Sequence, residues 1–101
     1  MLIYNVTLKI EWDISADWVE WMKKEHIPQV MDSGCFVKYQ FVKILQTDES
    51  EGPTYAVQYF AQGFTQYDHY IKELAPTLRE KTFEKWGAKF IAFRSLMEII
   101  E

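Results

Sequence analysis

The feature that most constrains the fold of this chain is a strand–helix–strand pattern that occurs twice. Alternation of apolar and polar residues predicts strands over residues 2–12, 35–46, 54–62 and 88–100. A helical repeat separates the first strand from the second, and another separates the third from the fourth. Each helix is followed by a glycine, Gly34 or Gly87. The predicted order is therefore β-α-β-β-α-β.

The first predicted helix runs from Ser15 toward Cys35. Ser15 is a typical N-cap residue, because its hydroxyl can accept one of the amide protons that the first turn leaves unpaired. Pro28 lacks an amide proton, so we expect the helix to kink or loosen there, and Gly34 suits the left-handed position that ends a helix. The apolar face follows the helical repeat through Val19, Met22, His26 and Val30.

The second predicted helix follows the same plan. Thr65 and Asp68 have the spacing of a capping box, and Pro76 is expected to bend or split this helix as Pro28 does the first. The helical pattern resumes after Pro76 and ends at Gly87. The apolar positions are Tyr67, Ile71, Leu74, Leu78, Phe83 and Trp86.

Two right-handed strand–helix–strand units can interleave in one sheet. This predicts a single domain over residues 1–101, an α+β fold with a four-stranded antiparallel sheet and two helices on one face, the ferredoxin-like plan. The first and third strands should be central. The apolar face of the sheet should lie under the helices, with Ile91, Phe93, Met97 and Ile99 contributed by the last strand.

The opposite face of the predicted sheet is mixed. Phenylalanines among polar groups there suit a partly buried cavity, and two such faces packed together would form a barrel across a two-fold axis. A wholly exposed face would have a similar composition, so both interpretations stand. The residues expected on this face are Asn5, Thr7, Lys9, Lys38, Gln40, Gln58, Phe60, Phe90 and Arg94.

Composition excludes several classes of partner. The net charge is −4 and there is no basic run, which argues against binding to nucleic acid. Aromatic residues make up 17% of the chain, which favours additional burial by self-association or by a ligand. A single cysteine fits a reducing compartment, and the alternating N-terminal residues are neither a signal peptide nor a membrane span. The sequence therefore predicts a cytoplasmic protein.

Five segments of the chain, IYNVT, WVEWM followed by HIP, GCF, TYAVQYF and KFIAFR, resemble a bacterial family of short ferredoxin-like proteins catalogued as a domain of unknown function. More distantly, the chain resembles the dimeric α+β barrel group, which includes cofactor-free monooxygenases and isomerases. The resemblance implies the fold and a homodimer formed through the sheet face opposite the helices. It brings no catalytic residues, and neither His26 nor His69 fits the proximal histidine of the haem-binding relatives.

His26 is the best candidate for catalysis. It lies on an apolar helix face beside a proline, where burial should keep the imidazole neutral and able to act as a general base. The alternative is a core histidine that bonds to a backbone carbonyl. His69 is expected to be a solvated surface residue, and Cys35 a small buried side chain rather than a nucleophile.

A ligand site is predicted on the mixed sheet face. Arg94, Lys9 and Lys38, with Gln58 and Asn5, would bind a carboxylate or another anion inside the barrel, or would instead form ion pairs with Glu11 and Glu98 at a dimer interface. Phe60 would add an aromatic contact, and Trp21, at the edge of the first helix, could line a ligand cleft. No metal-ligand spacing, glycine-rich phosphate loop or catalytic triad is present, so no metal and no cofactor are expected.

Three hypotheses about function follow. The first is a homodimer that binds a small organic molecule in an aromatic-rich cavity. The second is a cofactor-independent monooxygenase or isomerase with His26 as base. The third is a structural or regulatory dimer without a ligand. A cavity of a few hundred cubic ångströms that touches His26 would favour the enzyme.

Overall fold

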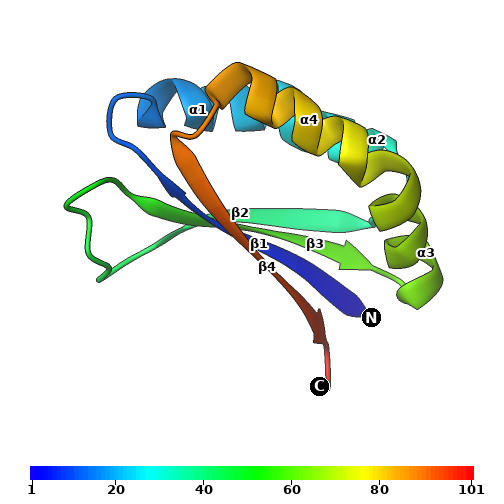
Figure 1. The fold of residues 1–101 in the computed structure, drawn as a ribbon. Helices are drawn as coiled ribbons and strands as arrows, with labels where there is room; N and C mark the ends of the chain where they lie inside the picture. Colours follow the sequence, from blue (N-terminus) through cyan, green and yellow to red (C-terminus); the bar gives the residue numbers. More distant parts are fainter.

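The predicted order of strands and helices is confirmed in the computed structural model, which describes Met1–Glu101. Each helical region is one continuous helix in which two α-helical parts flank a π-helical turn (Figure 1). In chain order the elements are β1 (Leu2–Ile10), α1 (Ser15–Trp21), the π turn η1 (Met22–His26), α2 (Ile27–Asp32), β2 (Lys38–Ile44), β3 (Thr54–Ala61), α3 (Phe64–His69), the π turn η2 (Tyr70–Leu74), α4 (Ala75–Trp86) and β4 (Phe90–Glu98).

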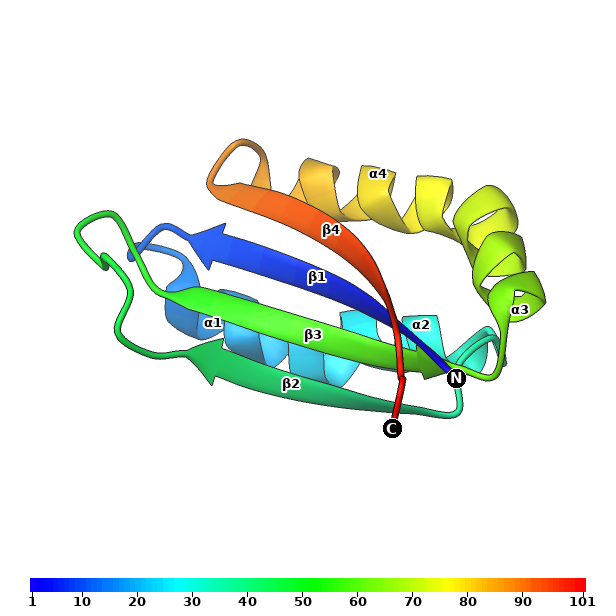
Figure 2. The same cartoon turned by 90° about the horizontal axis from the view of Figure 1, so that it is seen from below.

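The four strands form one antiparallel sheet in the order β2-β3-β1-β4. All helices lie on one face of this sheet, and Figure 2 shows the opposite face uncovered. The fold is therefore the ferredoxin-like α+β plan that the sequence predicts. We call the uncovered side the open face. None of the helices has the length and apolar character needed to cross a membrane.

The core lies between the central strands and the first helical region. Every second residue of β1 from Tyr4 to Ile10 is buried, as its alternating sequence predicts. From the helix side, Trp18, Met22, Ile27 and Val30 pack against this face, each at most 3% exposed. A cluster of stacked and tilted rings around Tyr4 fills the end of the core near α3. The first helical region is therefore firmly attached to the sheet.

Both helical prolines lie just after a π-helical turn, with one residue between. Pro28 lies in the first turn of α2, after η1, and Pro76 lies in the first turn of α4, after η2. A proline in a first turn needs no amide partner, and the wider π turn before it accommodates the carbonyls that its ring leaves unpaired. The expected loosening at both prolines is thus confirmed as a local change of helix type.

The predicted helix caps are wrong. The helix α1 begins at Ser15 without a side-chain cap, because the hydroxyl of Ser15 donates to the carbonyl of Trp12 (3.2 Å) instead of accepting from the first turn. The helix α3 begins at Phe64, one residue before Thr65, and it too lacks a side-chain cap. The predicted helix ends are confirmed, since Gly34 and Gly87 both have positive φ angles.

The predicted facing of β4 is also wrong. Arg94 pairs with the buried Val6 and Phe90 pairs with the buried Ile10, so these two residues face the helices. The bulky residues between them, Ile91 and Phe93, lie on the open face, where they are 54% and 66% exposed. The alternating positions of β4 are predicted correctly, but the more apolar of the two faces of this strand points away from the helices.

Candidate functional site

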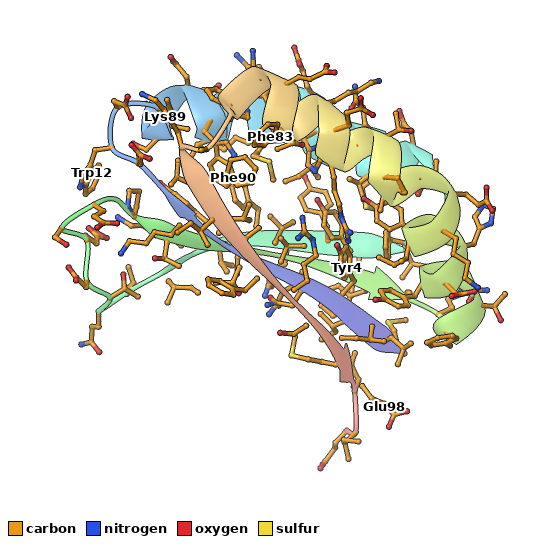
Figure 3. The ribbon with its side chains drawn as sticks, viewed as in Figure 1. Tyr4, Trp12, Phe83, Lys89, Phe90 and Glu98 are labelled. Carbon is orange, nitrogen blue, oxygen red and sulfur yellow. The ribbon has the colours of Figure 1, made fainter.

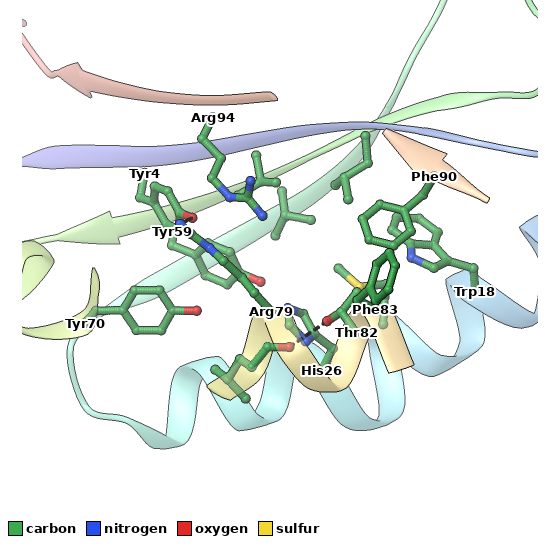
Figure 4. A pocket seen from close by; sticks show the side chains of 15 residues that line it. Tyr4, Trp18, His26, Tyr59, Tyr70, Arg79, Thr82, Phe83, Phe90 and Arg94 are labelled. Carbon is green, nitrogen blue, oxygen red and sulfur yellow. Dashed lines mark hydrogen bonds between the residues drawn. The ribbon is translucent and has the colours of Figure 1, made fainter. Parts of the chain in front are cut away.

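A cavity of about 210 Å³ lies between the helix-covered side of the sheet and α4. The first helical region contributes one side of it through Trp18, Met22 and His26. Side chains of the sheet form a second side of the cavity, and side chains of α4 form a third (Figure 4). Part of the space arises in the middle of β4, where the small residue Ala92 faces the helices between Phe90 and Arg94.

The two ends of the cavity differ in chemistry. Figure 4 shows Trp18, Phe83 and Phe90 together at one end. In Figure 3, Phe83 and Phe90 approach each other between α4 and the start of β4. The opposite end is polar, and His26 and Thr82 lie between the two ends. The residues of the polar end are Tyr4, Tyr59, Tyr70, Arg79 and Arg94.

The phenols of Tyr59 and Tyr70 at the polar end are protonated hydrogen-bond donors. Burial is the main cause that raises the pKa of Tyr59 and Tyr70 well above the usual value, and the neighbouring tyrosines add to it. The positive charges of Arg79 and Arg94 oppose this rise in the pKa of Tyr70. A group bound at this end would therefore meet neutral O–H donors beside two positive charges.

The two arginines reach the cavity from different elements. Arg79, on α4, donates a hydrogen bond from Nη2 to the hydroxyl of Tyr4 (3.2 Å). Arg94 extends from β4 toward the same end of the cavity (Figure 4). Both residues are exposed to solvent overall, so they mark the mouth of the cavity rather than its interior.

His26 lies on the wall of the cavity as a neutral imidazole. Burial alone lowers its pKa to about 4, and none of the side-chain hydrogen bonds of the chain includes it. The ring stacks on Trp21 with centroids 5.0 Å apart, and Trp21 in turn packs edge-on against Trp86. The expectation of a neutral histidine is confirmed for this half-buried side chain, whereas the bond to a backbone carbonyl that the alternative interpretation requires is absent.

Trp18 leaves one donor without a partner. Its side chain is fully buried against Phe41 and Tyr55, yet its indole N–H makes no hydrogen bond. An unpaired buried donor costs about 1–3 kcal/mol. Because Trp18 also lines the cavity, a ligand with an acceptor near this N–H would relieve that cost.

The structure separates the residues that the sequence grouped as a ligand site. Of these, Arg94 alone lies in the cavity, because its strand turns that position toward the helices. The others lie on the open face, where their partners are one another or near neighbours. Asn5 donates to Thr7 (3.0 Å), Gln40 donates to Gln58 (3.1 Å), and the ammonium of Lys38 lies 4.6 Å from the ring centre of Phe60. Lys9 shares this face on β1.

Three further candidates lie outside the cavity. Trp21 borders only shallow surface grooves, although its ring supports His26 from behind. His69 is exposed at the end of α3, as predicted. Cys35 is buried, as expected for a packing residue, and it does not line the cavity. No three His, Cys, Asp or Glu side chains come together as a metal site.

Sequence reasoning missed Arg79 and the three tyrosines. Tyr4 and Tyr59 belong to the apolar faces of the first and third predicted strands, which suggests a role in the core. Tyr70 and Arg79 fall outside the apolar repeat predicted for the second helix, so that repeat gives no reason to select them. One signal was available, since Arg79 and Arg94 are the only arginines of the chain. Two arginines among 101 residues are a signal that could have drawn attention to these positions.

Comparisons with known proteins place the chain among ferredoxin-like proteins. A family model described as "Domain of unknown function (DUF4286)" matches residues 1–100. No curated protein matches the sequence. Three similar solved structures share its fold at low sequence identity.

The first of these structures is an ethyl tert-butyl ether d (EthD) family protein from Bacillus halodurans, with TM-score 0.71, 11% identity and coverage of 99% of this chain and 100% of that one. The second is a dimeric ferredoxin-like protein from an uncultured marine organism, with TM-score 0.70, 12% identity and coverage of 99% and 95%. The third is a variant of SnoaB, a cofactor-independent oxygenase from Streptomyces nogalater, with TM-score 0.71, 8% identity and coverage of 99% and 94%.

Proposed function

Because the chain belongs to the DUF4286 family, a domain of unknown function, we propose its function from its own cavity: each subunit of a homodimer binds a small organic molecule between the sheet and α4. The observation that carries the proposal is the volume and lining of this cavity. An engineered apolar cavity of about 150 Å³ takes benzene, and drug-sized ligands occupy about 300 Å³ or more. The volume of about 210 Å³ suits a compound of one or two rings.

The homodimer uses the open face of the sheet. β4 presents Ile91, Phe93 and Met97 there, all exposed in the single chain. An apolar strand surface without a cover is typical of a protein–protein interface. A second copy of the chain is the partner, because a sheet packed on its own copy gives a closed, two-fold arrangement. The similar structure described as a dimeric ferredoxin-like protein supports this choice.

Filling the cavity tests the binding function. Thr82 is half-buried on the cavity wall, whereas Thr77 is exposed on the same helix and does not line the cavity. We expect Thr82→Trp to weaken binding of 2-naphthoate and 2-naphthamide at least tenfold in calorimetric titrations, and Thr77→Trp to change it less than twofold. If the folded parent protein binds neither compound, the binding function is wrong and the ligand-free structural or regulatory dimer takes its place.

A charge on the open face tests the dimer. Phe93 and Phe64 are similarly exposed, at 66% and 61%, but Phe64 lies on α3 rather than on the sheet. We expect the parent to sediment as a dimer, Phe93→Glu as a monomer, and Phe64→Glu as the parent does. A monomeric parent, or a Phe93→Glu variant that remains dimeric, would exclude this interface.

A second candidate function is base catalysis by His26, as in a cofactor-independent monooxygenase or isomerase. It is favoured by the neutral imidazole on the cavity wall and by the cofactor-independent oxygenase among the similar structures. A base with a pKa of about 4 is weak, since general bases work best with a pKa near the working pH. Binding is therefore the first proposal and catalysis the second.

Deuterium exchange tests the base directly. In D₂O, a base that removes a proton from the carbon beside the carbonyl of 2-tetralone returns a deuteron, which NMR detects. We expect the parent to accelerate this exchange, His26→Gln to lose at least tenfold in rate, and the surface control His69→Gln to keep the rate. Equal rates for His26→Gln and the parent would refute the base.

A further inference from the structure

The only two arginines of the chain line the same cavity. Asp and Glu number 15 and the net charge is −4, so a guanidinium group has many possible partners on this protein. Arg79 comes from α4 and Arg94 from β4, and the fold brings both to the polar end of the cavity (Figure 4). Two positive groups at one place repel each other unless an anion lies between them.

No carboxylate of the protein supplies that anion. All five ion pairs of the chain use a lysine, and none includes Arg79 or Arg94. No Asp or Glu lines the cavity. The one hydrogen bond that the side chain of Arg79 makes is to the hydroxyl of Tyr4. The positive charge of this end of the cavity is therefore uncompensated within the chain.

The neighbouring groups are also donors. Both guanidinium charges act on the phenol of Tyr70, and the phenols of Tyr59 and Tyr70 stay protonated at neutral pH. A planar guanidinium can donate two parallel hydrogen bonds to one carboxylate. An anion at this position would thus receive charge-assisted bonds from the arginines and further bonds from the phenols. Its place at the exposed mouth lets it keep part of its water shell, which lowers the cost of desolvation.

The opposite end of the cavity suits an aromatic ring, because it is formed mainly by the rings of Trp18, Phe83 and Phe90. We propose that the ligand is a one- or two-ring compound bearing a single carboxylate. This assignment rests on the binding function proposed above. The carboxylate is held between Arg79 and Arg94. The ring lies against the three aromatic side chains at the other end.

A matched pair of probes tests this assignment. 2-Naphthoate and 2-naphthamide share one ring system and differ mainly in charge. In calorimetric titrations we expect the parent to bind the carboxylate at least tenfold more tightly than the amide. We expect Arg79→Gln and Arg94→Gln each to weaken carboxylate binding about tenfold and amide binding less than twofold. Lys81→Gln removes one positive charge from an exposed position of α4 and should leave both affinities within twofold of the parent.

The outcomes distinguish this inference from the function on which it rests. If the amide binds as tightly as the carboxylate and the arginine variants bind as the parent does, the cavity binds ligands but the anion preference is wrong. If neither probe binds to the folded parent, both proposals are wrong. If Lys81→Gln weakens carboxylate binding as much as the arginine variants, general surface charge explains the effect and the assigned site is overturned. Circular dichroism of each variant confirms folding before titration.

Discussion

The two strand–helix–strand units of this chain share one plan but differ in how they are packed. In the first unit, the helix places four side chains in the core and β1 places four more. In the second unit, β3 also buries four residues, but the helical region buries only Tyr70 and Ala75, and β4 buries no residue at all. The helices and last strands of the two units therefore differ. The first helical region packs tightly on β1 and β3, whereas the second helical region and β4 leave room for a cavity on one side and present an apolar surface on the other.

The cause of this difference lies in which side chains face the helices. Toward the first helix, β1 and β3 direct large residues such as Tyr55 and Val57. Toward the second helix, the middle of β4 directs Ala92 and Arg94, with Phe90 at the start of the strand, while Ile91 and Phe93 point to the open face. A small residue and a long charged one leave a space between helix and sheet. Recognition therefore belongs to the unit that contributes least to the core.

The largest expected contrast is in stability. Ile27 in α2 is 2% exposed and packed on all sides, whereas Leu78 in α4 is half-buried and borders the cavity. We expect Ile27→Ala to lower the free energy of unfolding by about 3–4 kcal/mol and Leu78→Ala by about 1 kcal/mol. Urea denaturation followed by circular dichroism measures both. Equal losses would show that the two units are packed alike.

The pH dependence of stability is expected to come mainly from His26. Its pKa is about 4 in the folded protein and about 6.5 when exposed, so the unfolded chain binds the extra proton between these values. Stability is therefore complete above pH 6.5 and falls as the pH is lowered toward 4, by up to roughly 3 kcal/mol. His26→Gln should flatten this part of the curve. A His69→Gln control, on the surface, should keep it.

The next largest contrast is expected in the rates of amide hydrogen exchange of β4 and of the central strands. If β4 is covered by a second copy, its amides should exchange about 10 to 100 times faster in the Phe93→Glu variant than in the parent dimer. The amides of β1 and β3 should change less than threefold, because these strands are central in the sheet and the first helical region covers them. Mass spectrometry of peptides from residues 90–98 and 2–10 gives both rates. Uniform acceleration across the sheet would mean that the dimer supports the whole fold rather than the second unit.

The smallest expected effect is at the helix starts. Ser15→Ala and Thr65→Ala should each change the free energy of unfolding by less than about 0.5 kcal/mol, because neither side chain caps its helix. A true N-cap would cost about 1 kcal/mol. Thermal and urea unfolding of both variants are sufficient to tell these values apart. A loss near 1 kcal/mol in one variant alone would reveal a capping role that differs between the units.

The sequence predicted the fold well, because alternation and helical spacing are local properties of the chain. Residues 2–10 and 54–61 alternate cleanly, and the glycines at 34 and 87 end the helices as expected. The same reasoning identified His26, whose position on an apolar helix face made burial and a lowered pKa predictable. These inferences needed no knowledge of which elements meet.

The ligand site could not be predicted in this way, because alternation shows which residues share a face but not which face is covered. In β4 the more apolar side, with Ile91 and Phe93, was assigned to the helices, and it lies on the open face instead. Because of this reversed assignment, the sequence predicted Arg94 on the open face of the sheet. It also gave no indication that Arg94 and Arg79 line one cavity, because that arrangement depends on packing between elements distant in the sequence.

The π turn before α4 also sets the rotational phase of that helix. Such a turn holds one residue more than the regular winding it replaces, and one residue corresponds to about 100° around an α-helix. If Tyr70–Leu74 wound as a regular α-helix with every residue retained, α4 would rotate by about 100° and Arg79 would swing away from Tyr4. A relative with a one-residue gap at this point would instead wind this segment as an ordinary α-helix and still present the same side chains to whatever enters the hollow.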